Sequence, residues 1–442
     1  MVKLKLSVLK ILCLSLSLIV LVGCGSKTAL TPDNNDIIDE ILSGKDNLLG
    51  VNEGLIEKNF LEWISSEFGK ETLEKINSAI KDDSFTAESW YDITGNTALV
   101  LWDMYSGALD PENPNYRSDI KVIESKGDST IIRVVGDISF ADNWKIAPAL
   151  DERGKGVYGV LSEETVKLLR DADVFLANNE FTYSTRGEAL RGKMYTFRAK
   201  PSRVQHMLDI GADIVSLANN HAYDFGEYAF ADTLQTLKES DLPYIGGGAN
   251  IEEASKPFYF IVNGRKYGFS AATKAEKLVL TPEATETSSG VMRTYNPEKY
   301  LSVIASAEEQ CDYNIVYVHW GAEGSHQIED GLYEMGGKYI DAGADIVIGA
   351  HAHILQGIEY YKGVPIVYNL GNFIFNSETI DTGILEIEIK GNAATYRFIP
   401  AIQKDCYTEI VSGDEKERIL EFMEKLSVDI EFAEDGRFEE AD

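Results

Sequence analysis

Short apolar runs alternate with segments of helical spacing from Ile131 onward. The runs that have the length of buried strands are IIRVV, DVFLA, DIVSLA, NIVYV, DIVIGA and VPIVYNL. Most are followed by helical periodicity, as in GEYAFADTLQTLKES, and FYFIVNGRKYGFSAA has the pattern of a hairpin around Asn263-Gly264. This alternation predicts an α/β domain, and the hairpin favours mixed rather than purely parallel sheets.

The chain before this domain has a different texture. Residues 49–125 show helical apolar spacing, as in FLEWISSEFGKETLEKINSAI, and predict a small, mainly helical segment. The polar residues 24–48 predict a tether. The turn-rich DPENPNYRSD precedes the α/β domain, which we expect over residues 126–405, and residues 406–442 are expected to form a helical, acidic tail.

The first residues predict export. Three lysines precede an apolar stretch that ends in LVGC, which is the layout of a secretory signal peptide over residues 1–23. This box resembles the bacterial lipoprotein signal, so Cys24 is the expected lipidation site and the cell membrane an expected partner. An uncleaved transmembrane anchor is the alternative, because the stretch is nearly long enough to span a bilayer. Both interpretations place the body of the protein outside the cytoplasmic membrane.

Composition limits the classes of partner. The 442 residues carry 72 acidic and 41 basic side chains, a formal net charge of −31, which argues against nucleic-acid binding. Of the four cysteines, Cys13 leaves with the signal and Cys24 takes the lipid. Cys311 and Cys406 remain, and we expect two separate buried thiols, with a disulfide as the alternative.

Polar side chains follow the ends of the predicted strands. They are Asp137, Glu180, Asn220, His221, His319, His351 and His353. The carboxyl ends of strands form the rim where α/β sheets bind ligands, and four of the six histidines stand at this rim. Each residue alone is more often a turn cap or a surface residue. Together, carboxylates, an amide oxygen and imidazoles form the ligand set that Mn, Fe or Zn accepts.

A family resemblance is carried by five motifs in order. These are VGD at Asp137, LANNHAYDFG, VHWGAEGS, IDAGADIVIGAHAH and YNLGNFIF. Over roughly residues 130 to 378 they resemble the capsule-synthesis CapA family, which is associated with poly-γ-glutamate production. That family is similar in fold to calcineurin-like metallophosphoesterases. The resemblance implies a four-layered α/β/β/α sandwich with two divalent transition-metal ions at the strand ends.

The resemblance also implies roles for individual residues. The implied metal ligands are Asp137, Glu180, Asn220, His319, His351 and His353. His221 would act on the leaving group or stabilise the transition state, and Asp224 is close enough in sequence to orient it. Expected substrate contacts are Asn179, Glu323 and Asn372, together with Arg191, whose basic loop near Glu180 is a candidate for holding an anionic substrate, with an ordinary solvated loop as the alternative. Ser139 departs from the pattern, because many phosphoesterases have histidine there; Asp142 or water is the expected substitute.

Two functions are consistent with these patterns. The first is a membrane-anchored extracytoplasmic hydrolase with two metal ions, acting on an anionic polymer or phosphoester in capsule, poly-γ-glutamate or cell-envelope metabolism. The second is a polymer-handling component of a capsule synthesis and export machine with little or no turnover. Other capsule-synthesis proteins are expected partners in either case. A metal-free solute-binding lipoprotein is a third option, and the rim histidines argue against it.

Overall fold

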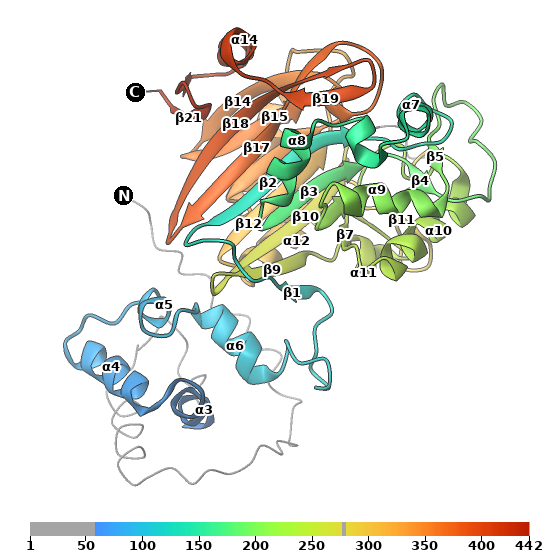
Figure 1. The fold of residues 1–442 in the computed structure, drawn as a ribbon. Helices are drawn as coiled ribbons and strands as arrows, with labels where there is room; N and C mark the ends of the chain where they lie inside the picture. The colour runs from blue at the N-terminus through green and yellow to red at the C-terminus, as the bar shows by residue number, and fades with distance from the viewer. Residues whose placement is uncertain (1–57, 276–279, 442) are drawn as a thin grey trace. The chain divides into compact units, whose positions relative to one another are not determined.

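A computed structural model describes residues 58–275 and 280–441 and divides the chain into two compact units (Figure 1). The first unit holds the described residues up to Val122, with 259–267 and 308–312. The second holds 123–258, 268–307 and the described residues from Tyr313 on. The predicted signal, tether and Cys24 lie outside the described residues. In the described part, no helix is long and apolar enough to cross a membrane.

The first unit is mainly helical, as expected. Its helices are α3 (Lys58–Phe68), α4 (Lys70–Lys81), α5 (Ser89–Thr94) and α6 (Ala98–Ser106). Aromatic rings fill much of their core, where Phe60 contacts Trp63 and Trp90. Strand β1 (Ile120–Val122) pairs in parallel with β9 (Phe258–Val262). The predicted turn after β9 is confirmed, since Asn263 and Gly264 have φ of 50° and 66°.

The larger sheet of the second unit is mixed. Its order is β20-β21-β18-β17-β2-β3-β6-β7, with β16 beside β2 and β19 beside β18. The strands are β2 (Thr130–Ile138), β3 (Val174–Asn179), β6 (Ile214–Ser216), β7 (Tyr244–Ile245), β16 (Asn372–Ile374), β17 (Ile380–Lys390), β18 (Ala393–Lys404), β19 (Tyr407–Ile410), β20 (Ile430–Phe432) and β21 (Arg437–Glu440). Strands β2, β3, β6 and β7 are parallel, whereas β17 runs antiparallel to β2.

A second sheet lies against the first. Within this unit its order is β10-β12-β13-β15-β14, with β12, β13 and β15 parallel and β14 antiparallel. The strands are β10 (Arg265–Thr273), β12 (Tyr313–His319), β13 (Ile346–Ala350), β14 (Leu355–Tyr361) and β15 (Val364–Leu370). The hydroxyl of Tyr317 in β12 donates to the carbonyl oxygen of Val135 in β2 at 3.1 Å, so the sheets face each other.

Helices cover the outer face of each sheet. On the larger sheet they are α7 (Ile146–Arg153), α8 (Glu163–Arg170), α9 (Val204–Asp209) and α10 (Gly226–Glu239), with η2 (Gly156–Gly159) and η3 (Pro201–Arg203) between them (Figure 1). On the other sheet they are α12 (Glu298–Glu308) and α13 (Asp330–Asp341). Successive side chains of a strand point to opposite faces of the sheet, which explains the layers. Val316 and Val318 of β12 pack toward these two helices, whereas Tyr317 faces the other sheet. The four-layered α/β/β/α sandwich is thus confirmed.

Several short elements and one long helix, α14, complete the second unit. They are β4 (Thr182–Tyr183), β5 (Arg198–Ala199), β8 (Gly247–Gly248), α11 (Ile251–Ala254), β11 (Gly290–Val291) and α14 (Gly413–Leu426). The segment after residue 405, expected to be a helical tail, is not helical throughout. Strands β19 and β21 both pair with β18, and Phe438 of β21 stacks on Tyr396 at 5.8 Å between ring centroids. Cys311 and Cys406 are both buried and no disulfide joins them, as expected.

Candidate metal centre

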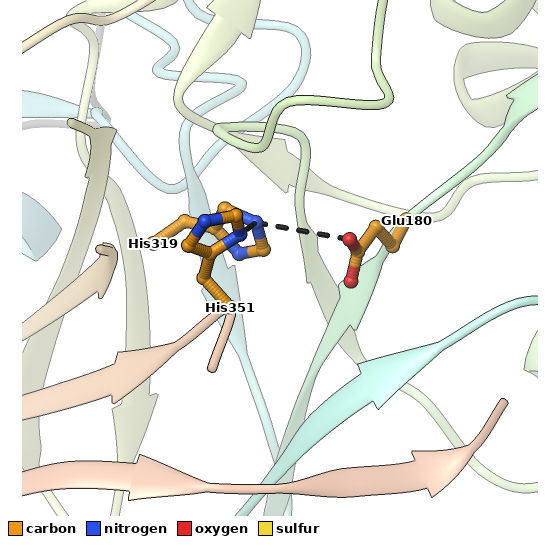
Figure 2. Close-up of side chains that lie close together, drawn as sticks. All are labelled: Glu180, His319 and His351. Carbon is orange, nitrogen blue, oxygen red and sulfur yellow. Dashed lines mark hydrogen bonds and ion pairs between the residues drawn. The ribbon is translucent and has the colours of Figure 1, made fainter. Parts of the chain in front are cut away.

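The six side chains expected to bind metal lie together at the carboxyl ends of the strands. The side chains form two groups, in each of which one ligand atom per residue lies within 4.8 Å of the others, and Glu180 belongs to both. The groups are Glu180, His319 and His351, and Asp137, Glu180 and His353. Figure 2 shows the first group, with Glu180 from the end of β3 facing the two imidazoles. Asn220 joins it, because its Oδ1 lies 2.8 Å from His319 Nε2.

Ring nitrogens and oxygens converge on one region of this cluster. His351 Nδ1 lies 3.0 Å from His319 Nε2, and Glu180 Oε1 lies 3.8 Å from the same nitrogen. Glu180 is fully buried, yet its Oε1 has no hydrogen-bond partner among the described residues. A buried carboxylate oxygen without a partner is costly, and a cation bound there would satisfy it. The donor set therefore fits a divalent transition metal.

Asp137 occupies the centre of the second group. Its Oδ1 accepts a hydrogen bond from Asn178 Nδ2 at 2.8 Å, and its Oδ2 lies 3.2 Å from His353 Nδ1. His353 Nδ1 also lies 2.8 Å from Asn372 Oδ1. Asp137 was expected just after its strand, but β2 continues to Ile138 because Asp137 pairs both with Asn178 of β3 and with Asn372 of β16.

Burial and mutual charge shift the pKa values in this cluster. Burial and the charge of Asp137 raise the pKa of Glu180 well above its usual range. Burial also opposes ionisation of Asp137, but the hydrogen bond and charge of His353 outweigh it and hold that pKa well below usual. Burial, with His353 nearby, lowers the pKa of His351 to about 3. Neutral imidazoles are ready to bind a metal, and Glu180 needs a nearby cation to ionise.

His353 behaves differently from the other rim imidazoles. Burial opposes its charged form, but the hydrogen bond and charge of Asp137, together with Asn372, raise its pKa. Its proton thus provides the positive charge that Asp137 requires. A cation in the second group would supply that charge and displace the proton, since metal binding releases protons from its ligands.

The backbone around the two histidines is strained. His351 has φ of 98° and His353 has φ of 61°, a region that residues other than glycine rarely adopt. Such conformations cost on the order of 1–3 kcal/mol each and cluster at functional sites. Gly349 in β13 permits the close approach just before them, because a Cβ there would lie 2.0 Å from the Tyr368 carbonyl oxygen. The GAHAH segment therefore adopts a backbone conformation that costs stability and that places the two imidazoles in the cluster.

His221 lies at the edge of the cluster and pairs with Asp224. His221 Nδ1 is 2.7 Å from Asp224 Oδ2, and Nε2 is 3.8 Å from Glu180 Oε1. Burial lowers the pKa of His221, although the charge of Asp224 opposes the shift. Because Asp224 accepts at Nδ1, the neutral ring carries its proton there and leaves Nε2 facing the cluster. This geometry suits a side chain that acts on a bound substrate.

The four expected substrate contacts lie in different settings. Asn179 is fully buried and donates from Nδ2 to the Phe181 carbonyl oxygen at 2.8 Å, whereas its Oδ1 has no partner among the described residues. Asn372 is held by His353. Glu323 is exposed, yet its charge contributes to the raised pKa of Glu180. Arg191 is exposed on the loop between β4 and β5.

Sequence reasoning missed three side chains in this region. Asn178 Nδ2 lies 2.8 Å from Asp137 Oδ1 and 3.2 Å from Glu180 Oε2, so it bridges the two carboxylates. Asn219 donates to Asn178 Oδ1 at 3.0 Å. Lys193, with its side chain 3% exposed, pairs with Asp224. The doubled asparagines in NNE and NNH could have indicated Asn178 and Asn219. Nothing in the sequence distinguishes Lys193 from the charged residues near it that face solvent.

Ser139 occupies the position where many phosphoesterases have histidine, and Asp142 does not replace that ligand. Ser139 is fully buried, and its Oγ has no partner among the described residues. Asp142 instead pairs with Arg203 at 2.9 Å and accepts from the Lys200 main-chain N–H at 2.7 Å. Its carboxylate is therefore committed to these groups and lies outside both ligand groups.

Comparison with known proteins identifies relatives of the second unit. The family model described as bacterial capsule synthesis protein PGA_cap matches residues 131–377. A capsule biosynthesis protein CapA of Bacillus anthracis is 31% identical over 236 residues, covering 51% of this chain and 57% of that protein. A PGA biosynthesis protein CapA of Bacillus subtilis is 30% identical and covers 52% and 61%. A probable polyglutamine synthesis accessory protein of Mycobacterium tuberculosis is 28% identical and covers 47% and 57%.

Solved structures give more distant matches. A Thermus thermophilus protein has 10% identity and a TM-score of 0.35, and the match covers 61% of this chain and 98% of that one. A 5'-nucleotidase from Candida albicans has 10% identity and a TM-score of 0.32, covering 61% and 51%. The chain spans only 57% and 61% of the lengths of the two Bacillus proteins.

Proposed function

The chain belongs to the family of bacterial capsule synthesis proteins PGA_cap, and from this premise we propose that it is an extracytoplasmic metal-dependent hydrolase of an anionic capsule or envelope polymer. The observation that carries the proposal is the convergence of Glu180, His319 and His351 in a buried cluster with an unpartnered carboxylate oxygen. The name of the Bacillus subtilis relative, a PGA biosynthesis protein, favours poly-γ-glutamate as the polymer.

The residues divide into two ligand groups that share Glu180. We assign Glu180, Asn220, His319 and His351 to one divalent ion, and Asp137, Glu180 and His353 to the other. Divalent ions held there would polarise a phosphoryl or acyl oxygen and lower the pKa of water toward neutrality. Asn178 keeps both carboxylates in place through its amide. Mn, Fe or Zn suits this set of nitrogen and oxygen donors.

His221 is the residue that we assign to proton transfer. Asp224 holds its ring by the Nδ1 contact at 2.7 Å, so Nε2 is free to face the leaving group of a bound substrate. Nε2 of the resting neutral ring must first take up a proton from water, and the charged ring then delivers this proton to the leaving group. Asp224 stabilises the charged ring before delivery and the Nδ1 tautomer after it.

The experiment that tests this proposal is metal-dependent turnover by the full chain. The protein is stripped with a chelator and reloaded with Mn, Fe or Zn. Bis(p-nitrophenyl) phosphate serves as the phosphodiester probe and poly-γ-glutamate as the polymer. We expect one of these ions to restore cleavage of at least one substrate. Metal uptake without cleavage of either substrate would contradict the hydrolase proposal.

A second candidate is the polymer-handling component with little turnover. The observation that favours it is Ser139, a buried hydroxyl where many phosphoesterases have a metal-binding imidazole. One ion would then have fewer protein ligands and bind less tightly. Polymer binding that needs metal but leaves polymer length unchanged would support this candidate over the hydrolase.

We further propose that the chain is a lipoprotein anchored through Cys24. The support is the LVGC box that closes the apolar amino-terminal stretch. An anchor would hold the second unit at the outer surface of the cell membrane, where capsule polymer emerges. Other capsule-synthesis proteins are the partners that such a location would offer.

A further inference from the structure

Lys193 places a buried ammonium group beside the metal centre. Its side chain is 3% exposed, and Nζ lies 2.6 Å from Asp224 Oδ1. The same Nζ donates to the main-chain carbonyl oxygen of Asn220. Lysine is rarely buried unless it is paired. Here both contacts lead to residues of the proposed active site.

Most residues of the loop that carries Lys193 are exposed, although its two ends are buried. It runs from residue 184 to 197, between β4 and β5, and Met194 next to Lys193 is 86% exposed. Other bonds already fasten this loop. Leu190 donates its main-chain N–H to the Asp224 carbonyl oxygen at 2.9 Å, and Phe197 donates its own to Asp224 Oδ2 at 2.7 Å. The ammonium group is therefore not the only attachment of the loop.

Three donors together fix the Asp224 carboxylate. Oδ1 receives Lys193, and Oδ2 receives both His221 Nδ1 and the Phe197 main-chain N–H. With Oδ1 engaged by a cation, the carboxylate cannot rotate to offer His221 a different oxygen. Asp224 thus holds the ring by Nδ1, and His221 Nε2 stays directed toward Glu180.

We propose that Lys193 is a positioning residue that holds the His221–Asp224 pair and the main chain of Asn220 in working alignment. The ammonium acts through Asp224 on the proton-transfer imidazole, and through the Asn220 carbonyl on a proposed metal ligand. Lys193 lies outside both ligand groups. The catalytic purpose of this alignment rests on the proposed function, whereas the alignment itself rests on the contacts of Lys193.

The kinetic test uses the full, metal-loaded chain with bis(p-nitrophenyl) phosphate. Lys193→Met keeps the length of the side chain and removes its charge. We expect kcat to fall by roughly 10–100-fold with KM little changed, as for other residues that orient ligands and catalytic groups. Metal content per chain should stay at the wild-type level. Lys193→Ala should recover part of its rate with added butylamine, whereas Lys193→Met should not.

The matched control is Lys126→Met. The ammonium of Lys126 also binds main-chain carbonyl oxygens, those of Arg170 and Ala172 at 2.7 and 2.6 Å, but it is not part of the metal centre. This variant should keep wild-type kcat. Lys193→Arg retains the charge and should lie between wild type and Lys193→Met, so it supplies the comparison if Lys193→Met does not fold.

A second readout does not depend on turnover. The readout is the NMR spectrum of zinc-loaded protein labelled with ¹⁵N-histidine. The signals of His221 are identified by their absence from the spectrum of His221→Gln. We expect the Nδ1-protonated tautomer in the wild type and a mixture of tautomers in Lys193→Met. Failure of the proposed function would leave wild type without turnover but with this NMR difference. The same tautomer in both proteins, or loss of metal and rate in parallel, would overturn the role of Lys193.

Discussion

At the scale of single residues, the centre depends on neighbours that point in different directions. Asn220 directs Oδ1 toward His319 Nε2 at 2.8 Å, whereas the adjacent His221 turns to Asp224. The sequence predicts that both stand at a strand end, and its Asn-His step resembles the phosphoesterase pattern. The contact with Asp224, three residues further along the chain, was expected from the sequence, whereas the contact with His319 at the end of β12 is visible only in the fold.

Substitution of each residue should therefore have a different consequence. His221→Ala should retain metal and lower turnover of a cleaved substrate by about 10²–10⁴-fold, the usual effect of removing a positioned acid–base group. Asn220→Ala should weaken metal binding, so that excess metal partly restores its rate. Titration of each variant with metal, followed by rate and by elemental analysis, measures both effects. Normal metal binding and wild-type rates in both variants would show that catalysis occurs elsewhere.

Prediction from sequence reached the ligands but not the groups that hold them. Asp137, His319 and His351 were recognisable because polar residues after apolar runs stand at the ligand-binding rim. Asn178 and Lys193 were not, because their importance depends on which distant segments meet. A lysine in a basic loop is usually solvated, and only the fold shows that Lys193 reaches a buried carboxylate.

At the scale of elements, parallel strands deliver the ligands to one edge. His319 pairs in register with Ala350, immediately before His351, and Asp137 pairs with Asn178 two residues before Glu180. Apolar runs were sufficient to predict these strands. They did not show that β2 continues through Asp137, where Asn178 of β3 and Asn372 of β16, which is far away in sequence, both pair with it.

Strand β13 can be placed correctly only if residue 349 has no side chain. A Cβ at Gly349 would lie 2.0 Å from the Tyr368 carbonyl oxygen and 2.4 Å from Trp320 Nε1. Gly349→Ala should lower the free energy of unfolding by about 1–3 kcal/mol, the usual cost of overpacking, and weaken metal binding by displacing His351. Urea unfolding and metal titration measure the two effects.

The control for this substitution is Gly127→Ala. Nothing lies within 4 Å of a Cβ at Gly127, and its φ is outside the left-handed region. The variant should match wild type in both assays. Equal stability of Gly349→Ala and Gly127→Ala would show that β13 tolerates a shift, and the close approach would then not explain how His351 is placed.

At the scale of the whole molecule, charge and anchoring bear on the substrate. A net charge of −31 repels an anionic polymer from most of the surface, so local cations at the centre would have to attract it. Tethering would offset that repulsion by keeping the protein close to the polymer as it emerges. The acidity was readable from composition, whereas the grouping of ligands at one rim required the fold.

The anchor can be tested without knowledge of the substrate. Cys24→Ala should abolish incorporation of labelled fatty acid and leave an unprocessed or shed protein, because it removes the proposed attachment site of the lipid. Cys406→Ala, which removes a buried thiol of the second unit, is the control and should be labelled like wild type. Equal labelling of Cys24→Ala and wild type would contradict the lipoprotein proposal.

The most direct test of a metal centre is the metal content of the full chain by elemental analysis. We predict one to two transition-metal ions per chain in the wild type. The double substitution of His351→Ala and His353→Ala should remove most of them, because the remaining carboxylates bind such ions more weakly. His206→Ala, which removes an imidazole outside both ligand groups, should keep them. Unchanged metal content in the double variant would contradict the assignment of the cluster.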